Sequence, residues 1–155
     1  MSTPKADDRL AQACWEAARH AAVLDEALTQ WAAQRRVQSI AAIESDPELR
    51  RLADQIVFRF TKLQDALGER LVPATLASLL EPYENRPVRD RLDRLEKLGY
   101  LDVGDWLRWR EMRNRLAHEY PDAPELRQAQ LLSAIVAAAE IVAAWRRWRG
   151  LLGTG

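Results

Sequence analysis

The chain has 155 residues, of which 48% are hydrophobic and 30% are charged, a balance that is typical of a globular domain and excludes a disordered chain. Lysine and arginine number 23, as do aspartate and glutamate, so the formal net charge is zero. This balance argues against a protein that coats nucleic acid through bulk positive charge, although a local basic patch could still contact RNA. The length indicates one domain over residues 1–155, with a core of its own.

The composition also bounds the cofactors and the compartment. Cys14 is the only cysteine, which excludes an intramolecular disulfide and a zinc site built on paired cysteines. The six glycines form no phosphate-binding loop and no strand-like alternation occurs, so we expect no nucleotide-binding α/β fold, no cofactor and no metal. The polar N-terminus and the lack of eighteen consecutive apolar residues predict a soluble, cytoplasmic protein without membrane contact.

Apolar residues recur at helical spacing, and the first half of the chain contains two predicted long helices. The first covers roughly residues 8–37, and its apolar face consists of Leu10, Cys14, Ala17, Ala21, Leu24 and Leu28. A capping side chain followed by proline, in the run Ser45 to Glu48, predicts the start of the second helix. Its apolar face consists of Leu52, Ile56, Phe60, Leu63 and Leu67, and Gly68 is its expected C-cap. A short helical segment over residues 71–83 follows.

The second half of the chain contains three more predicted helices, after a turn between Pro82 and Pro87. The third covers about residues 88–98, buries Val88, Leu92 and Leu95, and ends at Gly99. The fourth begins near Asp102 or Asp105. A capping box over residues 122–125 starts the fifth, which ends at Gly150 and buries Leu131, Ile135, Ala138, Val142 and Trp145. Because the linkers are short, we expect an all-α fold, an antiparallel bundle of four or five helices.

A group of functional side chains stands at the end of the fourth helix. Residues 113–120 read Arg-Asn-Arg-Leu-Ala-His-Glu-Tyr, just before Pro121. This run places a fixed cation (Arg113), a general acid or base (His118) and a phenol (Tyr120) within about two helical turns. Such groups could act on a phosphodiester without a metal.

The geometry of this run contains a conflict. On a continuous helix Arg113 lies on the side of Trp106 and Trp109, where a guanidinium needs a hydrogen-bond acceptor. His118 would then point about 140° away from Arg113. Because Pro121 pushes the preceding residue out of the α region, the helix should loosen near residues 118–120 and bring the imidazole back. Alternatively, His118 meets Arg113 of a second copy across a two-fold axis.

A purely structural interpretation of the same run is equally supported by its spacing. Histidines near helix C-termini often interact only with the helix dipole and the last carbonyl groups. An Arg-Asn-Arg run is usually solvated, and a tyrosine before proline commonly packs against it.

The segment from Trp106 to Pro121 resembles the signature of the HEPN superfamily, and more narrowly that of HepT, the toxin of HepT–MNT toxin–antitoxin pairs. These proteins carry an arginine, four to six residues, a histidine, any residue and a tyrosine at the end of a bundle helix. The match falls on Arg113, His118 and Tyr120, with Asn114 in the polar position after the arginine. The segment 60–69 is also similar to the family, and the predicted helix order covers nearly the whole chain.

The resemblance implies a two-fold homodimer whose motifs face a shared cleft and cleave RNA without a metal. His118 would transfer a proton, Arg113 would clamp the phosphate, Asn114 would orient one of these groups, and Tyr120 would hydrogen-bond the phosphate. The partner is an MNT-type nucleotidyltransferase antitoxin in a type II/VII-like pair. In the family this partner can AMPylate the tyrosine, here Tyr120, and so silence the toxin.

Two other functions are compatible with the same bundle. One is a non-catalytic substrate-binding or docking subunit for a nucleotidyltransferase, and the other is a plain dimerisation module. If RNA binds, the first candidates for phosphate contacts are Arg146, Arg147 and Arg149. His20 is predicted to be half-buried or on the surface, and the acidic residues at positions 90, 93 and 96 form a salt-bridged surface rather than a metal site. The six tryptophans are expected mostly in the core or an interface.

Overall fold

The computed structural model describes residues 2–34 and 39–153, and all regular structure in these residues is helical. The elements are α1 (Pro4–Ala32), α2 (Ile40–Ser45), α3 (Pro47–Ala66), a π-helical turn η1 (Leu67–Leu71), α4 (Val72–Ser78), α5 (Val88–Lys97), α6 (Val103–Arg115) and α7 (Pro124–Leu151). The predicted all-α class is confirmed.

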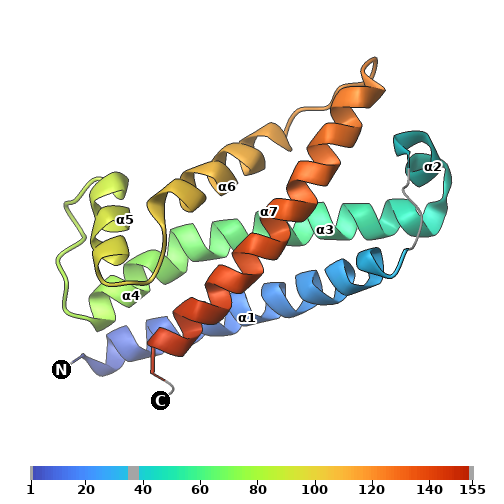
Figure 1. Cartoon of the computed structure of the whole chain (residues 1–155). Coiled ribbons are helices and arrows are strands. Elements are labelled where there is room, and N and C mark those ends of the chain that lie inside the picture. Colours follow the sequence, from blue (N-terminus) through green and yellow to red (C-terminus); the bar gives the residue numbers. More distant parts are fainter. Residues whose placement is uncertain (1, 35–38, 154–155) are drawn as a thin grey trace.

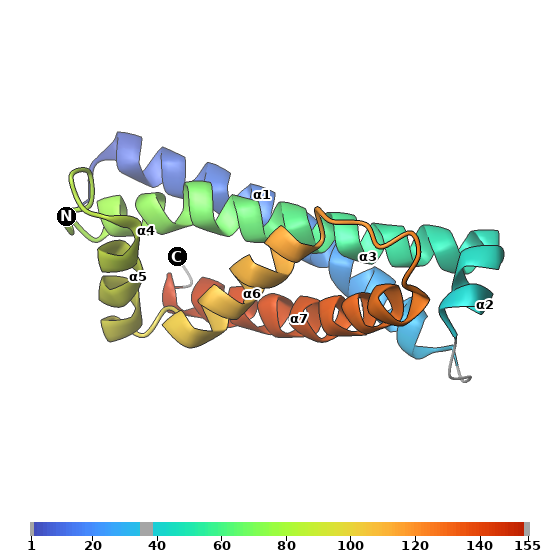
Figure 2. The ribbon, with the colours of Figure 1, turned by 90° about the horizontal axis from the view of Figure 1, so that it is seen from above.

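Three long helices carry most of the core, since α1, α3 and α7 all pack against one another. In Figure 1, α1 and α3 run side by side and α7 crosses them obliquely, with the first turn of α1 and the last turn of α7 at the same end of the molecule. α6 packs on α3 and α7, and Figure 2 shows α5 standing across the end of the longer helices. The last turn of α6 and the loop before α7 therefore lie at the end opposite to α5.

Local sequence explains where several helices begin. Asp46 Oδ1 accepts hydrogen bonds from the backbone N–H groups of Glu48 and Leu49, at 2.9 and 3.3 Å, and Pro47 occupies the first turn of α3. Asp102 Oδ1 caps α6 in the same way, accepting from Asp105 N at 2.8 Å. Gly99, with φ of +89°, follows the end of α5 as predicted.

Other predicted boundaries are wrong. α1 begins after the Thr3 cap and ends at Ala32, so the predicted helix 8–37 is too late at its start and too long at its end, and residues 35–37 lie outside the described residues. The short α2 was not predicted. α7 begins after Ala123 without a side-chain cap, so the capping box is absent, and it passes through Gly150. Val88, predicted to be buried, is 54% exposed at the start of α5, whereas Leu92 one turn later is buried.

Gly68 does not end a helix, because the chain continues from α3 through η1 into α4. A Cβ atom on Gly68 would lie 3.0 Å from Cζ2 of Trp106, which is buried in α6. The glycine is therefore needed for the close approach of the indole ring, and not for a left-handed backbone conformation.

Gly68→Ala should lower the free energy of unfolding by about 1 kcal/mol, measured by urea denaturation. Alanine gains about 1 kcal/mol of helix propensity, but crowding a rigid buried ring costs about 1–3 kcal/mol. Gly150→Ala is the matched control, because nothing lies within 4 Å of the added methyl group, and it should stabilise slightly. A more stable Gly68→Ala protein would show that Trp106 moves freely.

The tryptophans divide between the core and the surface. Trp106, Trp109, Trp145 and Trp148 are buried, as expected, whereas the side chain of Trp15 is 66% exposed.

In the described part of the chain, α7 is the one helix that is long and apolar enough to cross a membrane, with a mean hydropathy of 1.4 over its most apolar window. Core helices meet the same criterion, and α7 packs on α1, α3 and α6, so this is weak evidence and a soluble protein is compatible with it.

Candidate functional site

Arg113 is held by a carboxylate that the sequence pattern did not reveal. Its Nε and Nη2 atoms donate to Oδ1 and Oδ2 of Asp65 on α3, at 3.0 and 3.1 Å. These hydrogen bonds and the negative charge of Asp65 raise the pKa of the Arg113 guanidinium. The expected need for an acceptor beside the tryptophan-rich face is thus met. The pair uses one edge of the guanidinium, and Nη1 makes no hydrogen bond to a described residue.

Residues 118–120 before Pro121 are not helical, as predicted, but the helix ends earlier than expected. α6 ends at Arg115, and Leu116 is its C-cap. The backbone N–H of His118 donates to the carbonyl oxygen of Arg115 at 2.9 Å, which closes a turn and leaves the imidazole exposed. Asn114, in the last turn of α6, is also exposed.

His118 and Tyr120 line the same surface groove, of about 540 Å³. Asp54 and Val57 of α3 form one wall, and residues 127, 130 and 131 of α7 form another. Arg113 does not line this groove. Within one chain, the structure therefore brings the histidine and the tyrosine together and leaves the arginine beside Asp65.

Arg127 anchors the loop that carries the histidine. Its Nη1 donates to the carbonyl oxygens of Tyr120 and Pro121, at 2.7 and 3.1 Å. Its Nε and Nη2 atoms donate to the two carboxylate oxygens of Glu44 on α2, both at 2.9 Å. No sequence pattern indicates this role, because Arg127 lies outside the motif and its carboxylate partner is distant in the chain.

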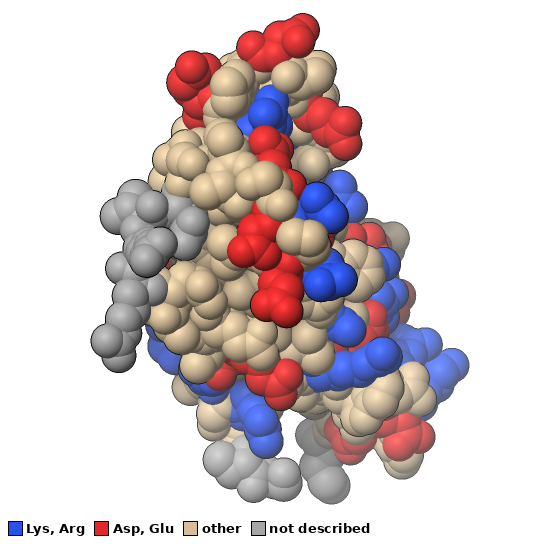
Figure 3. Space-filling view, turned by 90° about the vertical axis from the view of Figure 1, so that its right-hand side faces the viewer, with Lys and Arg blue, Asp and Glu red and all other residues tan. Residues whose placement is uncertain are grey.

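The groove is acidic. Glu44, Asp54 and Glu119 line it together with Arg127, and because Arg127 and Glu44 neutralise each other, Asp54 and Glu119 leave the lining with a net negative charge. Figure 3 shows mainly acidic side chains at the top of the molecule, where the loop between α6 and α7 lies. An RNA phosphate in this groove would therefore depend on cations from a neighbouring surface.

The C-terminal arginines are far from the groove. Arg146 forms an ion pair with Asp25 at 2.9 Å, and Arg147 and Arg149 are exposed. Arg127 lines the groove, and the 22 residues of helix from it to Arg149 span about 33 Å. The predicted phosphate contacts are therefore not brought to His118 within one chain.

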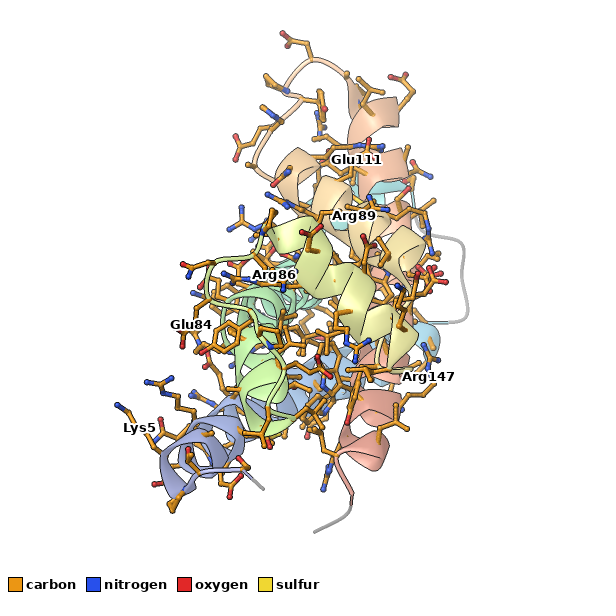
Figure 4. All side chains as sticks on the ribbon, turned by 90° about the vertical axis from the view of Figure 1, so that its left-hand side faces the viewer. Lys5, Glu84, Arg86, Arg89, Glu111 and Arg147 are labelled. Carbon is orange, nitrogen blue, oxygen red and sulfur yellow. The ribbon has the colours of Figure 1, made fainter. Side chains whose placement is uncertain are left out.

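On the side of the molecule seen in Figure 4, the labelled basic side chains are interspersed with acidic ones. The labelled Lys5, Arg86, Arg89 and Arg147 project from separate elements, and Glu84 and Glu111 project among them. Within residues 2–34 and 39–153, no group of three or more histidine, cysteine, aspartate or glutamate side chains could hold a metal ion.

No protein-family model, curated protein or solved structure matches the chain. The interpretation of the site therefore depends on its own residues. One part of the site is an exposed histidine beside a half-buried tyrosine in one groove. The other part is an arginine five residues before this histidine, which a carboxylate on α3 orients.

Proposed function

We propose that the chain is a cytoplasmic, metal-independent endoribonuclease toxin of the HEPN type, from a type II/VII-like toxin–antitoxin pair. The observation that carries the proposal is the exposed position of His118 on a turn outside the helix, in a groove shared with Tyr120. A histidine that served only the helix dipole would need neither the groove nor the tyrosine.

The chemistry is transesterification within RNA. The 2′-oxygen attacks the phosphorus, the bond from phosphorus to the 5′-oxygen breaks, and the products carry a 2′,3′-cyclic phosphate and a 5′-hydroxyl group. His118 takes the proton from the 2′-hydroxyl or gives one to the leaving 5′-oxygen. The free Nη1 edge of Arg113 stabilises the charge that develops on the phosphate, while Asn114 and Tyr120 hydrogen-bond to the substrate.

A second copy of the chain supplies the arginine in this proposal, because Arg113 and the groove are separate within one copy. An exposed apolar stripe on the outer face of α7 supports a two-fold homodimer of HEPN-like bundles. The stripe consists of Ala129, Leu132, Val136, Ala139 and Ala143. Its alternating spacing of three and four residues is typical of a helix–helix seam, and it adjoins Gln130 and Leu131 of the groove.

Val136→Glu should convert the dimer to a monomer, because Val136 is the most exposed large residue of the stripe, at 61%. Light scattering coupled to gel filtration should show the mass falling from twice to once the 17.7 kDa of the chain. Val88→Glu, at an exposed position on α5, is the matched control and should leave the mass unchanged. A wild-type mass of one chain would contradict the dimer.

The proposed antitoxin is an MNT-type nucleotidyltransferase that AMPylates Tyr120. Adenylate at Tyr120 would fill the groove beside His118 and exclude RNA. Tyr120→Phe should therefore remain toxic when the partner is co-expressed, and mass spectrometry should find one added nucleotide on the wild type alone. A nucleotide on the Tyr120→Phe protein would place the modification elsewhere.

The nuclease proposal is tested with the purified chain and single-stranded RNA in excess EDTA, alongside growth after induction without the partner. Cleavage products with cyclic phosphate ends and growth arrest are the expected results. Intact RNA and normal growth with folded protein would contradict the proposal.

The acidic groove favours a second candidate function, a non-catalytic docking subunit for a nucleotidyltransferase. The carboxylates of Asp54 and Glu119, which form no ion pair with a described residue, would repel RNA and would suit a basic surface of a partner protein. This function predicts a stable complex with the nucleotidyltransferase, no toxicity, and partner activity that depends on the groove.

A further inference from the structure

Exposed aromatic rings accompanied by cations mark one face of the α1–α3 pair. Trp15 and Phe58 are 66% and 50% exposed. The Arg19 guanidinium lies 5.8 Å from the centroid of the Trp15 ring. Arg59 and Lys62 lie 5.6 and 5.5 Å from the centroid of Phe58. We refer to these five residues as the α1–α3 patch.

The cations of the patch lie near His20, which is buried at the contact between α1 and α3. Arg59 Nη1 lies 2.9 Å from His20 Nδ1, which must be an acceptor, because an arginine only donates. Burial lowers the pKa of His20, and the charges of Arg59, Arg19 and Lys62 lower it further, against an opposing contribution from Glu16. The imidazole is thus held neutral and does not repel an anion.

Nothing in the described residues neutralises these three cations. The carboxylate of Glu16, on the same helix as Arg19, receives two short hydrogen bonds from Arg70, and that of Asp65, three residues after Lys62 on α3, accepts hydrogen bonds from Arg113. Nε of Arg59 is buried and has no hydrogen-bond partner in the described residues. Three unneutralised cations in a chain of zero net charge form a local positive field.

The patch adjoins both halves of the candidate site through one stretch of α3. Asp54 and Val57 line the groove with His118, and Asp65 holds Arg113. Phe58 and Lys62 lie between these positions on the same helix. Phe58 follows Val57 directly, and it is separated from Asp65 by seven residues, which places the two within about 20° around the helix axis.

We propose that the α1–α3 patch binds single-stranded RNA and leads it along α3 to the site. Unpaired bases stack on Trp15 and Phe58, while Arg19, Arg59 and Lys62 contact phosphates. Bases within a duplex are not accessible to such rings, so the patch selects unpaired RNA. The inference rests on the proposed nuclease function for the identity of the nucleic acid, and it supplies the cations that the acidic groove lacks.

Fluorescence anisotropy of a labelled oligouridine tests the patch in the His118→Ala form of the 155-residue chain, in which RNA cleavage is expected to be about 10²–10⁴-fold slower. Phe58→Ala should weaken binding about ten-fold, as the loss of one stacked base does. Phe58→Tyr keeps an aromatic ring at this position and should bind as tightly as the protein with Phe58. Lys62→Ala should weaken binding and reduce the slope of log affinity against log salt by about 0.7. Lys97→Ala, an exposed lysine on α5, is the matched control and should change neither.

Equal binding by Phe58→Ala, Lys62→Ala and Lys97→Ala would overturn the inference, as would no binding of oligouridine or equally tight binding of duplex RNA. The nuclease proposal fails separately. If the wild type leaves RNA intact but binding depends on the patch, the inference stands without the nuclease. If the patch variants bind and cleave RNA normally, the inference alone fails.

Discussion

His118→Ala is expected to abolish growth arrest and to slow RNA cleavage by about 10²–10⁴-fold, the usual contribution of a general acid or base. His118 is exposed, and its side chain has no hydrogen bond to a described residue. The substitution should therefore leave the helical circular dichroism, the unfolding transition and the oligomeric state unchanged. Cleavage of a labelled RNA in EDTA measures the effect directly.

Glu119→Gln is the matched control for this prediction, because it changes the neighbouring exposed residue of the same loop and groove. It should preserve cleavage, or increase it slightly by removing a negative charge near the phosphate. Undiminished cleavage by the His118→Ala protein would assign the reaction to other residues. Equal loss in both variants would indicate a disturbed loop.

Arg113→Ala should also eliminate most cleavage, by about 10²–10³-fold, as the loss of one fixed donor to a developing oxyanion does. It should in addition lower the free energy of unfolding by about 1 kcal/mol, because the half-buried carboxylate of Asp65 loses its partner. Cleavage assays and urea denaturation of the same preparation separate the two effects.

The double variant Arg113→Ala/Asp65→Ala distinguishes catalysis from structure. Removing both charges should recover most of the stability, since no unpaired carboxylate remains, while cleavage stays low. Recovery of cleavage together with stability would show that Arg113 acts only by holding α6 on α3. In Asp65→Asn the arginine remains but is less firmly oriented, so an intermediate cleavage rate is expected.

Features decided by neighbouring residues could be predicted from the sequence. The Asp46-Pro47 start of α3, the end of α5 at Gly99 and the loosening before Pro121 all depend on short-range sterics or capping. The role of Gly68 could not be predicted, because a helix C-cap and a contact with a distant indole ring both require a glycine. Only the packing of α6 on α3 decides between them.

The candidate site shows the same division. The motif placed Arg113, His118 and Tyr120 near one another in the chain, and the need for an acceptor beside Arg113 followed from its apolar neighbours. The identity of this acceptor, Asp65, depends on how the helices pack. Nothing in the local sequence distinguishes Asp65 from the other carboxylates of the chain. The exposure of Trp15 and Phe58 could have been predicted from the sequence, because neither residue belongs to the predicted apolar face of its helix.

The hydrogen bonds of Arg127 connect α2 directly to the loop that carries His118. A single guanidinium holds the carbonyl oxygens of Tyr120 and Pro121 on one side and the carboxylate of Glu44 on the other. Without the carboxylate of Glu44, Arg127 could still hold the two carbonyl oxygens through Nη1, but α2 would no longer fix the guanidinium in place. The position of the histidine is thus coupled to a short helix on the molecular surface, at the opposite end of the molecule from the C-terminal arginines.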